Sequence, residues 1–226
     1  MFSNASTLSP TAKQPKITPP DAQSISTLRA HRWSDLPSGA GVYWWYFSET
    51  ELDRLRISEF CQVDRLKLRR SPDGKLCLYH GMAKQLAQRV RWHAERPLSL
   101  DDLRSGILST FRFTLLSLND FDYLAGSDEI DRFMDDLSLS WIQANSREEA
   151  EAIESAELAG EFQFPLNISQ NKCVDLKSYL RFLSSIRKAY KQRYLATENQ
   201  PDRSSRVTQS SAKKKSSARV RLDESF

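Results

Sequence analysis

The sequence lacks the features on which membrane, secreted and zinc-binding proteins depend. No apolar run reaches the roughly 18 residues of a membrane span, and the amino terminus has no apolar signal-peptide core. The three cysteines, Cys61, Cys77 and Cys173, are odd in number and have no metal-type spacing, which indicates reduced, structural thiols. We therefore expect a cytoplasmic protein without a membrane segment, a disulfide framework or a zinc site.

Apolar residues are scarce at both ends of the chain. Residues 1–27 are rich in Ser, Thr, Pro, Ala and Gln without periodicity, and residues 197–226 are similarly polar. Neither end carries a zinc-finger or helix-turn-helix pattern. Over the whole chain, 39% hydrophobic residues and five tryptophans favour a folded globule. We expect a flexible arm over 1–27, a folded domain over 28–196 and a disordered basic tail over 197–226.

Charges of the two signs are segregated along the chain. Residues 203–221 hold seven basic residues and no acid, so the rest of this +4 chain sums to 4 − 7 = −3. Residues 65–96 hold nine Lys or Arg and two acids, whereas residues 120–161 hold thirteen acids and two arginines. A basic face beside an acidic one suits a polyanion bound with a divalent cation. Ordinary solvated faces would give the same counts.

Three segments have strand-like patterns. GVYWWYF, residues 41–47, is apolar throughout, which predicts a central strand covered on both faces. After a short helix near 49–56, RLKLRR and KLCLYHG flank the turn sequence SPDG, which predicts a hairpin whose second strand ends at Tyr79. LSLSWIQ, residues 137–143, alternates like a half-buried strand.

Apolar periodicity predicts four longer helices. They cover residues 84–95, residues 100–118, a segment opening at Ser146, and residues 176–190. Arg89 and His93 share one face of the first helix because they are four residues apart. Ser146 and Glu149 form a capping box at the start of the third.

Two carboxylates interrupt the apolar stripe of the helix that opens at Ser146. The stripe consists of Ala150, Ile153, Glu154, Glu157 and Leu158. Because a buried, unpaired carboxylate is costly, such a residue lies at the stripe edge, pairs with a cation or binds a metal. The stripe alone leaves all three explanations open.

The order of these motifs resembles the GIY-YIG nuclease family. GVY (41–43) and YHG (79–81) are followed by an arginine ten residues after Tyr79, a histidine four later, and a helical glutamate before Pro-Leu-Asn. The likeness covers residues 36–171. STFR (109–112), LSW (139–141) and PLNISQN (165–171) are similar to a group of small bacterial proteins of that family.

The resemblance implies a compact α/β (α+β) domain with a small, mainly antiparallel three-stranded sheet flanked by helices. It implies an endonuclease that cuts phosphodiester bonds in DNA with one divalent cation, Mg²⁺ or Mn²⁺. Arg89 would bind nonbridging phosphate oxygens, and Glu154 would be the metal ligand. Such chemistry activates water and stabilises the charge that develops on the phosphate and the leaving 3′ oxygen.

The resemblance assigns the remaining catalytic positions to Tyr43, Tyr79 and His93. Tyr43 is favoured as general base or water positioner, and Tyr79 would orient water or phosphate. Without the motif, plain packing with a backbone hydrogen bond explains each tyrosine. His93 either contacts phosphate or assists Tyr43. His31 and His80 receive no role.

The sequence departs from the family pattern in three places. Residues 48–74 form an insertion whose basic residues, including Arg69 and Arg70, are expected to contact DNA. Met82 stands where many members have lysine, so Lys84 is its expected substitute. The segment between the helical glutamate and the Pro-Leu-Asn motif is long, which leaves Glu157 as a second candidate ligand.

Two other functions remain open. Lys84, Arg91, Arg69 and Arg70 are the candidate nucleic-acid contacts, and with the basic tail they would also serve a noncatalytic DNA- or RNA-binding module. Nothing in the cleft residues excludes a 2′ hydroxyl, so a ribonuclease is a third reading.

Overall fold

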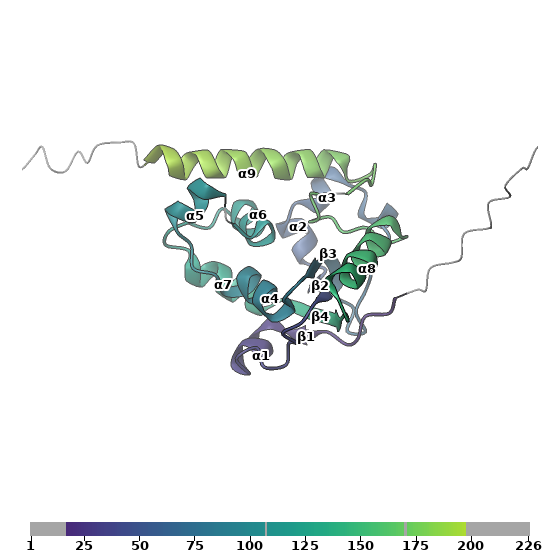
Figure 1. Cartoon of the computed structure of the whole chain (residues 1–226). Helices are drawn as coiled ribbons and strands as arrows, with labels where there is room; N and C mark the ends of the chain where they lie inside the picture. The colour runs from purple at the N-terminus through teal and green to yellow at the C-terminus, as the bar shows by residue number, and fades with distance from the viewer. Residues whose placement is uncertain (1–16, 107, 170, 198–226) are drawn as a thin grey trace, which may run out of the picture.

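The computed structural model describes residues 17–106, 108–169 and 171–197 (Figure 1). Its centre is an antiparallel sheet in the order β1-β4-β2-β3. The mainly antiparallel sheet is as expected, but four strands take the place of three. The strands are β1 (Gln23–Ser24), β2 (Gly41–Phe47), β3 (Leu76–Ala83) and β4 (Ser138–Gln143).

Helices cover both faces of this sheet. In chain order they are α1 (Ile25–Ala30), α2 (Glu51–Arg54), α3 (Ile57–Phe60), a 3₁₀ turn (Val63–Arg65), α4 (Leu86–Glu95), α5 (Leu100–Ser105), α6 (Thr110–Asn119), α7 (Ser127–Asp135), α8 (Arg147–Ala159) and α9 (Lys177–Thr197). Within the described ranges no helix is long and apolar enough to cross a membrane.

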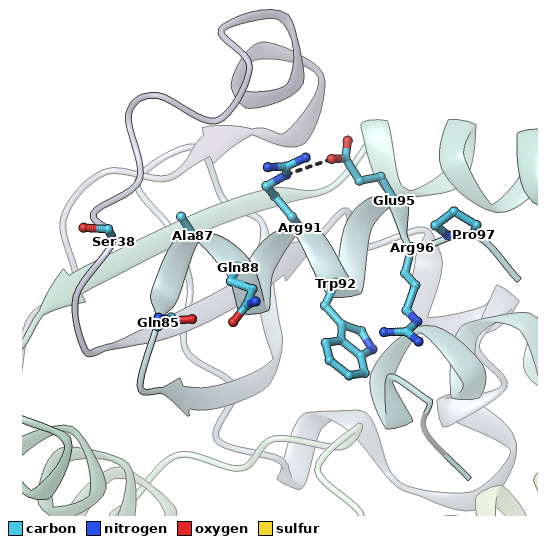
Figure 2. A pocket seen from close by; sticks show the side chains of 9 residues that line it. All are labelled: Ser38, Gln85, Ala87, Gln88, Arg91, Trp92, Glu95, Arg96 and Pro97. Carbon is cyan, nitrogen blue, oxygen red and sulfur yellow. Dashed lines mark hydrogen bonds and ion pairs between the residues drawn. The ribbon is translucent and has the colours of Figure 1, made fainter. Parts of the chain in front are cut away.

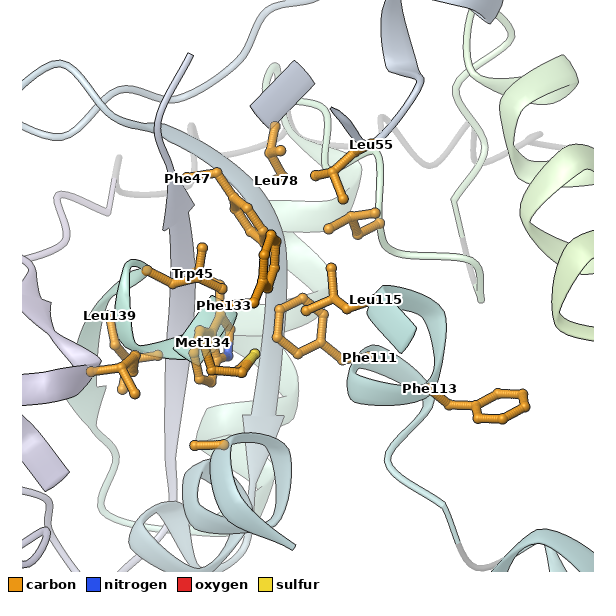
Figure 3. Packing of buried hydrophobic residues seen from close by; sticks show 14 of the residues in the cluster. Trp45, Phe47, Leu55, Leu78, Phe111, Phe113, Leu115, Phe133, Met134 and Leu139 are labelled. Atoms are coloured by element: carbon orange, nitrogen blue, oxygen red, sulfur yellow. The ribbon is translucent and has the colours of Figure 1, made fainter. Parts of the chain in front are cut away.

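Strand β2 is the centre of the core because it pairs on both edges and is buried on both faces. Tyr43, Trp45 and Phe47 point to one face, called here the Tyr43 face, where they pack against α4, α6 and α7. Figure 3 shows Trp45 and Phe47 in this core. Val42, Trp44 and Tyr46 point to the opposite face, called here the Trp44 face, which α8 covers (Figure 1). The aromatic run therefore forms two cores at once, as its continuous apolar pattern predicts.

A β-bulge interrupts the pairing of β2 with β3. Trp45 is opposite Tyr79, but the next residue, Tyr46, is opposite Cys77, so Leu78 is an extra residue on β3. Both Leu78 and Tyr79 consequently belong to the core on the Tyr43 face, while Cys77 packs on the other. Tyr79 shares the face of Tyr43 because it pairs with Trp45, and the bulge places Cys77 on the opposite face.

The outer edge of β3 is closed by a side chain. The Asn167 amide accepts from the His80 N–H at 2.9 Å and donates to the His80 carbonyl at 2.7 Å, imitating a neighbouring strand. The Leu166 N–H adds a bond to the Leu78 carbonyl at 2.9 Å. Asn167 lies in the Pro-Leu-Asn motif, which therefore protects a sheet edge.

The expected arm over 1–27 ends too late, and residues 1–16 lie outside the described part of the chain. Gln23 and Ser24 pair with β4, and Ser24 then caps α1 by accepting from the Thr27 N–H at 3.1 Å. Ile25 and Leu28 are fully buried. Two strand residues and one helical turn are too short to show periodicity. Of the expected tail, only residue 197 is described, as the last residue of α9.

The single helix expected over 100–118 is two helices. Gly106 adopts a left-handed conformation with φ 73°, which ends α5, and the Ser109 hydroxyl caps α6 by accepting from the Arg112 N–H. The apolar stripe continues across the break, so periodicity alone did not reveal it. Helix α7 was not predicted.

The expected hairpin is only partly formed. Gly74, with φ 85°, lies in the turn. Between the two described sides of the turn, one isolated β-bridge pairs Arg70 with Leu76. Lys67 instead exchanges hydrogen bonds with Gln163 in the segment after α8. The alternating pattern of RLKLRR therefore goes with contacts to the segment after α8.

Arg69, expected to contact DNA, is 7% exposed and belongs to the core on the Trp44 face. Its guanidinium lies 2.6 Å from the Glu157 carboxylate, which also accepts from the Trp44 indole at 3.3 Å. Of the three explanations for a carboxylate on the apolar stripe, pairing with a cation therefore applies to Glu157. Its paired carboxylate is a poor candidate for a metal ligand.

We predict that Arg69→Ala lowers the free energy of unfolding by about 3–5 kcal/mol, because it leaves Glu157 buried without its cation. Its neighbour Arg70 provides a matched control, since the Arg70–Glu49 pair is 55% and 67% exposed, and Arg70→Ala should cost at most about 1 kcal/mol. Urea unfolding of both variants measures the difference. Equal losses would contradict the buried pair.

Candidate active site

Two phenols from adjacent strands meet on the Tyr43 face. The rings of Tyr43 and Tyr79 are 6.3 Å apart between centroids, and Tyr79 stacks on Phe111 of α6 at 4.4 Å. Tyr43 is 1% exposed, whereas Tyr79 is only partly buried. Tyr79 is thus the phenol nearer to solvent.

Gly81 provides the space for the Tyr43 hydroxyl. The two residues are direct partners across β2 and β3, and a Cβ at Gly81 would lie 2.6 Å from Tyr43 Oη. Any larger residue at position 81 would displace the phenol. The glycine of YHG is therefore explained by the tyrosine of GVY.

His93 on α4 connects the Tyr43 hydroxyl to α6. Its Nε2 is 2.9 Å from Tyr43 Oη, and its Nδ1 is 2.6 Å from Ser109 Oγ. Burial, followed by the charges of Arg89 and Arg112, holds the His93 pKa well below its usual range, so the ring is neutral at pH 7. One nitrogen then donates and the other accepts.

The position of His93 bears on the two alternatives that the sequence left open. The ring is fully buried and both nitrogens are engaged within the protein. Contact with phosphate would require an exposed nitrogen. The geometry matches assistance to Tyr43.

Both phenols resist ionisation. Burial is the main reason that the pKa of Tyr43 lies well above its ordinary value and that the pKa of Tyr79 is raised. The Arg89 charge lowers both values and the Glu154 charge raises both. These opposing effects link residues from β2, β3, α4 and α8 in one electrostatic environment.

Arg89 lies one helical turn before His93 on α4, as the i, i+4 spacing predicts. Its guanidinium carbon is 5.9 Å from the Trp92 ring centroid, and a hydrogen bond from Arg89 helps to lower the pKa of Tyr43. Among the described residues, no carboxylate pairs with Arg89. A charged fork without an acid partner is suited to bind an anion.

Glu154 is held by the first turns of α8. The Ser146 hydroxyl accepts from the Glu149 N–H at 3.2 Å, which confirms the cap, although the Glu149 carboxylate bonds to Asn145 rather than back to Ser146. Burial raises the pKa of Glu154, and a backbone hydrogen bond at Met82 and the Arg89 charge oppose the shift. Glu154 is thus half-buried beside β3.

Glu154 is an oxygen ligand without a second carboxylate. Within the described residues no three His, Cys, Asp or Glu side chains are grouped as metal ligands. A single carboxylate fits Mg²⁺ or Mn²⁺, which keep most of their waters, and does not fit zinc. A bound cation would also offset the burial of the Glu154 charge.

Two surface hollows flank Trp92. One, of about 660 Å³, is lined by Arg91, Arg96 and neighbouring residues of α4, with Arg91 bonded to Glu95 at 2.9 Å (Figure 2). The other, of about 460 Å³, is lined by Lys84 and Arg89. Of the four candidate nucleic-acid contacts, Lys84 and Arg91 line these hollows, Arg70 is exposed elsewhere and Arg69 is buried.

Sequence reasoning missed Ser109, which bonds to the candidate site through His93. The N-cap pattern at Ser109, followed by an apolar run, was present in the sequence, but a helix assumed to begin at residue 100 concealed it. Arg187 of α9, whose charge lowers the pKa of Tyr79, was also missed. No sequence pattern distinguishes it from the other basic residues of that helix.

We predict that Gly81→Ala destabilises the protein by about 1–3 kcal/mol, because the new methyl group overlaps the Tyr43 hydroxyl. Gly39→Ala is the control, since the nearest atom to its added Cβ is 3.5 Å away, and it should change stability by about 0.5 kcal/mol or less. Thermal unfolding of both variants tests this. A Gly81→Ala protein as stable as the control would refute the close contact.

We predict that Glu154→Gln melts at a higher temperature than the wild type at pH 7 without added metal. Burial raises the Glu154 pKa above the ordinary 4.5, so the charged form is disfavoured in the folded state and protonation stabilises the fold. The difference should close as the pH falls through the raised pKa. Melting curves from pH 7 to pH 4 measure it, and a lower melting temperature at pH 7 would contradict it.

Comparison with known proteins agrees with this arrangement. A model of the GIY-YIG catalytic domain matches residues 41–189, a range that includes both phenols, α4 and α8. No curated protein and no solved structure matches the chain. Because the match covers more than half of the sequence, the chain belongs to the family of the GIY-YIG catalytic domain.

Proposed function

We propose that the protein is a metal-dependent endonuclease that hydrolyses phosphodiester bonds in DNA. Membership of the GIY-YIG family indicates a nuclease-type function and a nucleic acid substrate. The observation that carries the finer proposal is the approach of Tyr43 to Tyr79, with ring centroids 6.3 Å apart, and to His93 at 2.9 Å, where the charges of Arg89 and Glu154 act on both phenols. These groups supply a proton path, a phosphate ligand and a cation ligand.

Arg89 binds the scissile phosphate in this proposal. Its guanidinium has no acid partner among the described residues, so it need not break an ion pair to meet an anion. Two parallel N–H bonds to nonbridging oxygens would strengthen as negative charge builds up on them during attack.

Tyr43 positions the attacking water and passes on its proton. Its raised pKa disfavours a phenolate at neutral pH, so we assign the neutral phenol this role. The Tyr43 oxygen takes a proton from water while its own proton moves 2.9 Å to His93 Nε2. The Nδ1–H then donates to Ser109. The water oxygen bonds to phosphorus as the bond to the 3′ oxygen breaks, and the 3′ oxygen leaves as an alkoxide that takes a proton from solvent water.

Tyr79 orients the phosphate. It is the more exposed phenol and keeps its proton because its pKa is raised. A neutral hydroxyl donates a hydrogen bond to a phosphate oxygen without adding charge. Its ring is fixed by stacking on Phe111.

Glu154 would hold the divalent cation, Mg²⁺ or Mn²⁺. Nucleases of this family generally depend on such an ion, which lowers the pKa of bound water and neutralises charge on phosphate oxygens. The half-buried Glu154 carboxylate has no cation partner within hydrogen-bonding distance among the described side chains. A half-buried carboxylate that the chain does not pair with a cation is suited to bind one, which supports the assignment.

The hollows beside Trp92 are the proposed nucleic-acid contact. Arg91 lines one hollow, and Lys84 lines the other together with Arg89. We propose that residues 28–196, with the preceding β1 and α1, act as the nuclease domain, and that the basic tail adds nonspecific affinity. The three free thiols suit a reducing compartment such as the cytoplasm.

Cleavage assays test the proposal. Supercoiled plasmid, branched DNA, single strands and RNA are incubated with Mg²⁺, Mn²⁺ or EDTA. We expect metal-dependent cutting of DNA that falls roughly 10²- to 10³-fold in Glu154→Gln and Arg89→Gln. Tyr43→Phe should fall roughly 10²- to 10⁴-fold, because it removes the oxygen that takes the proton from water.

Glu148→Gln on α8 and Arg132→Gln on α7 are matched controls, since both residues are exposed, and both variants should cut like the wild type. Metal-independent cutting, or full activity in folded Glu154→Gln, would contradict the ligand assignment. Binding without any cutting would favour the noncatalytic module, and exclusive cutting of RNA would favour the ribonuclease.

A further inference from the structure

Arg187 is a partly buried arginine with no polar partner among the described residues. It lies in the middle of α9, the long helix that runs past α5 and α6 (Figure 1). Its Nε is buried and makes no hydrogen bond. The guanidinium carbon is 5.7 Å from the Phe113 ring centroid, which is its one described aromatic contact.

The Nε atoms of Arg112 and Arg69 are also buried without a partner among the described residues, but these two arginines are paired through their terminal nitrogens. Arg112 reaches the Ala94 carbonyl at 2.8 Å and the Asp131 carboxylate at 2.6 Å. Arg69 reaches the Ile17 carbonyl at 3.1 Å and Glu157 at 2.6 Å. A buried cation without such a partner is costly, so the absence of one at Arg187 calls for an anion from outside the chain.

The neighbour of Arg187 shows where that anion would bind. Arg187 lowers the pKa of Tyr79, and Tyr79 in turn raises that of Arg187, which burial otherwise lowers. Phe113 lies on α6, whose Phe111 stacks on Tyr79. The guanidinium therefore packs on α6, the helix on which the more exposed phenol stacks, and lies close enough to that phenol for the two charges to interact.

We propose that Arg187 is a second phosphate-binding arginine, which contacts a phosphodiester group of the substrate strand beside Tyr79. This inference rests on the proposed function and adds a ligand from a helix that carries none of the other site residues. Arg89 on α4 and Arg187 on α9 would then bind the strand from two separate elements. A phosphate of the bound strand would be the anionic partner that Arg187 lacks among the described residues.

The test combines stability with the salt dependence of binding. Arg187→Met keeps the length and the contact with Phe113 but removes the charge. The free protein should melt at the same temperature or higher, because an unpaired buried cation is lost. Binding to a DNA duplex in EDTA should weaken roughly 10- to 100-fold, and the slope of log affinity against log salt should fall by about 0.9.

Arg181→Met is the matched control, since Arg181 is exposed on the same helix and should leave the slope unchanged. Arg187→Lys should keep the slope but lose part of the affinity, because one ammonium replaces the planar fork. A methylphosphonate scan, which neutralises one phosphate of the duplex at a time, then locates the contacted phosphate. When that phosphate is neutral, Arg187→Met and the wild type should bind equally.

A lower melting temperature or unfolding of Arg187→Met, or an unchanged slope, would overturn the proposal and give the arginine a structural role. A wild type that binds with the expected slopes but never cuts would refute the nuclease mechanism and leave the Arg187 contact in place. A wild type that binds no DNA would overturn both.

Discussion

The register of β2 with β3 is the constraint on which the candidate site depends. Gly81 pairs with Tyr43 and Tyr79 pairs with Trp45, and because residues paired across two strands share a face, both phenols point to the Tyr43 face. Gly81 also leaves room for the Tyr43 hydroxyl opposite it. The bulge at Leu78 lies just beyond this pairing and sends Cys77 to the opposite face. Helix α4 packs on the Tyr43 face, while Asn167 closes the outer edge of β3.

Buried charge separates the structural part of the molecule from the candidate site. Arg69 and Arg112 are each paired with a carboxylate and a backbone carbonyl, which makes their burial tolerable. Arg89, Arg187 and Glu154 lie near the phenols without such partners in the described chain. Groups held in this way cost stability in the free protein, which is the trade-off expected at a site that binds charged ligands. The buried arginines of the core are therefore paired within the chain, whereas the charged residues near the phenols have no such partner among the described residues.

Much of this arrangement was predictable from local patterns. The continuous apolar run predicted β2, alternation predicted β4, and Ser146 predicted the start of α8. Motif spacing brought Arg89 and His93 to one helical face. Prediction failed where the decisive contact was distant in sequence or very short. Gly106 broke a stripe that continued across it, and β1 has only two residues.

By itself, the sequence determined which residues are apolar, where helices can begin and which side chains are candidates for the chemistry, because these depend on residue type and near neighbours. Only the tertiary structure decided which of two stripe carboxylates is paired. Glu157 meets Arg69, 88 positions away, while the charge of Glu154, one helical turn earlier, raises the pKa of both phenols. It also decided that His93 is buried against Tyr43. Such outcomes depend on long-range packing, which places groups that no local pattern relates.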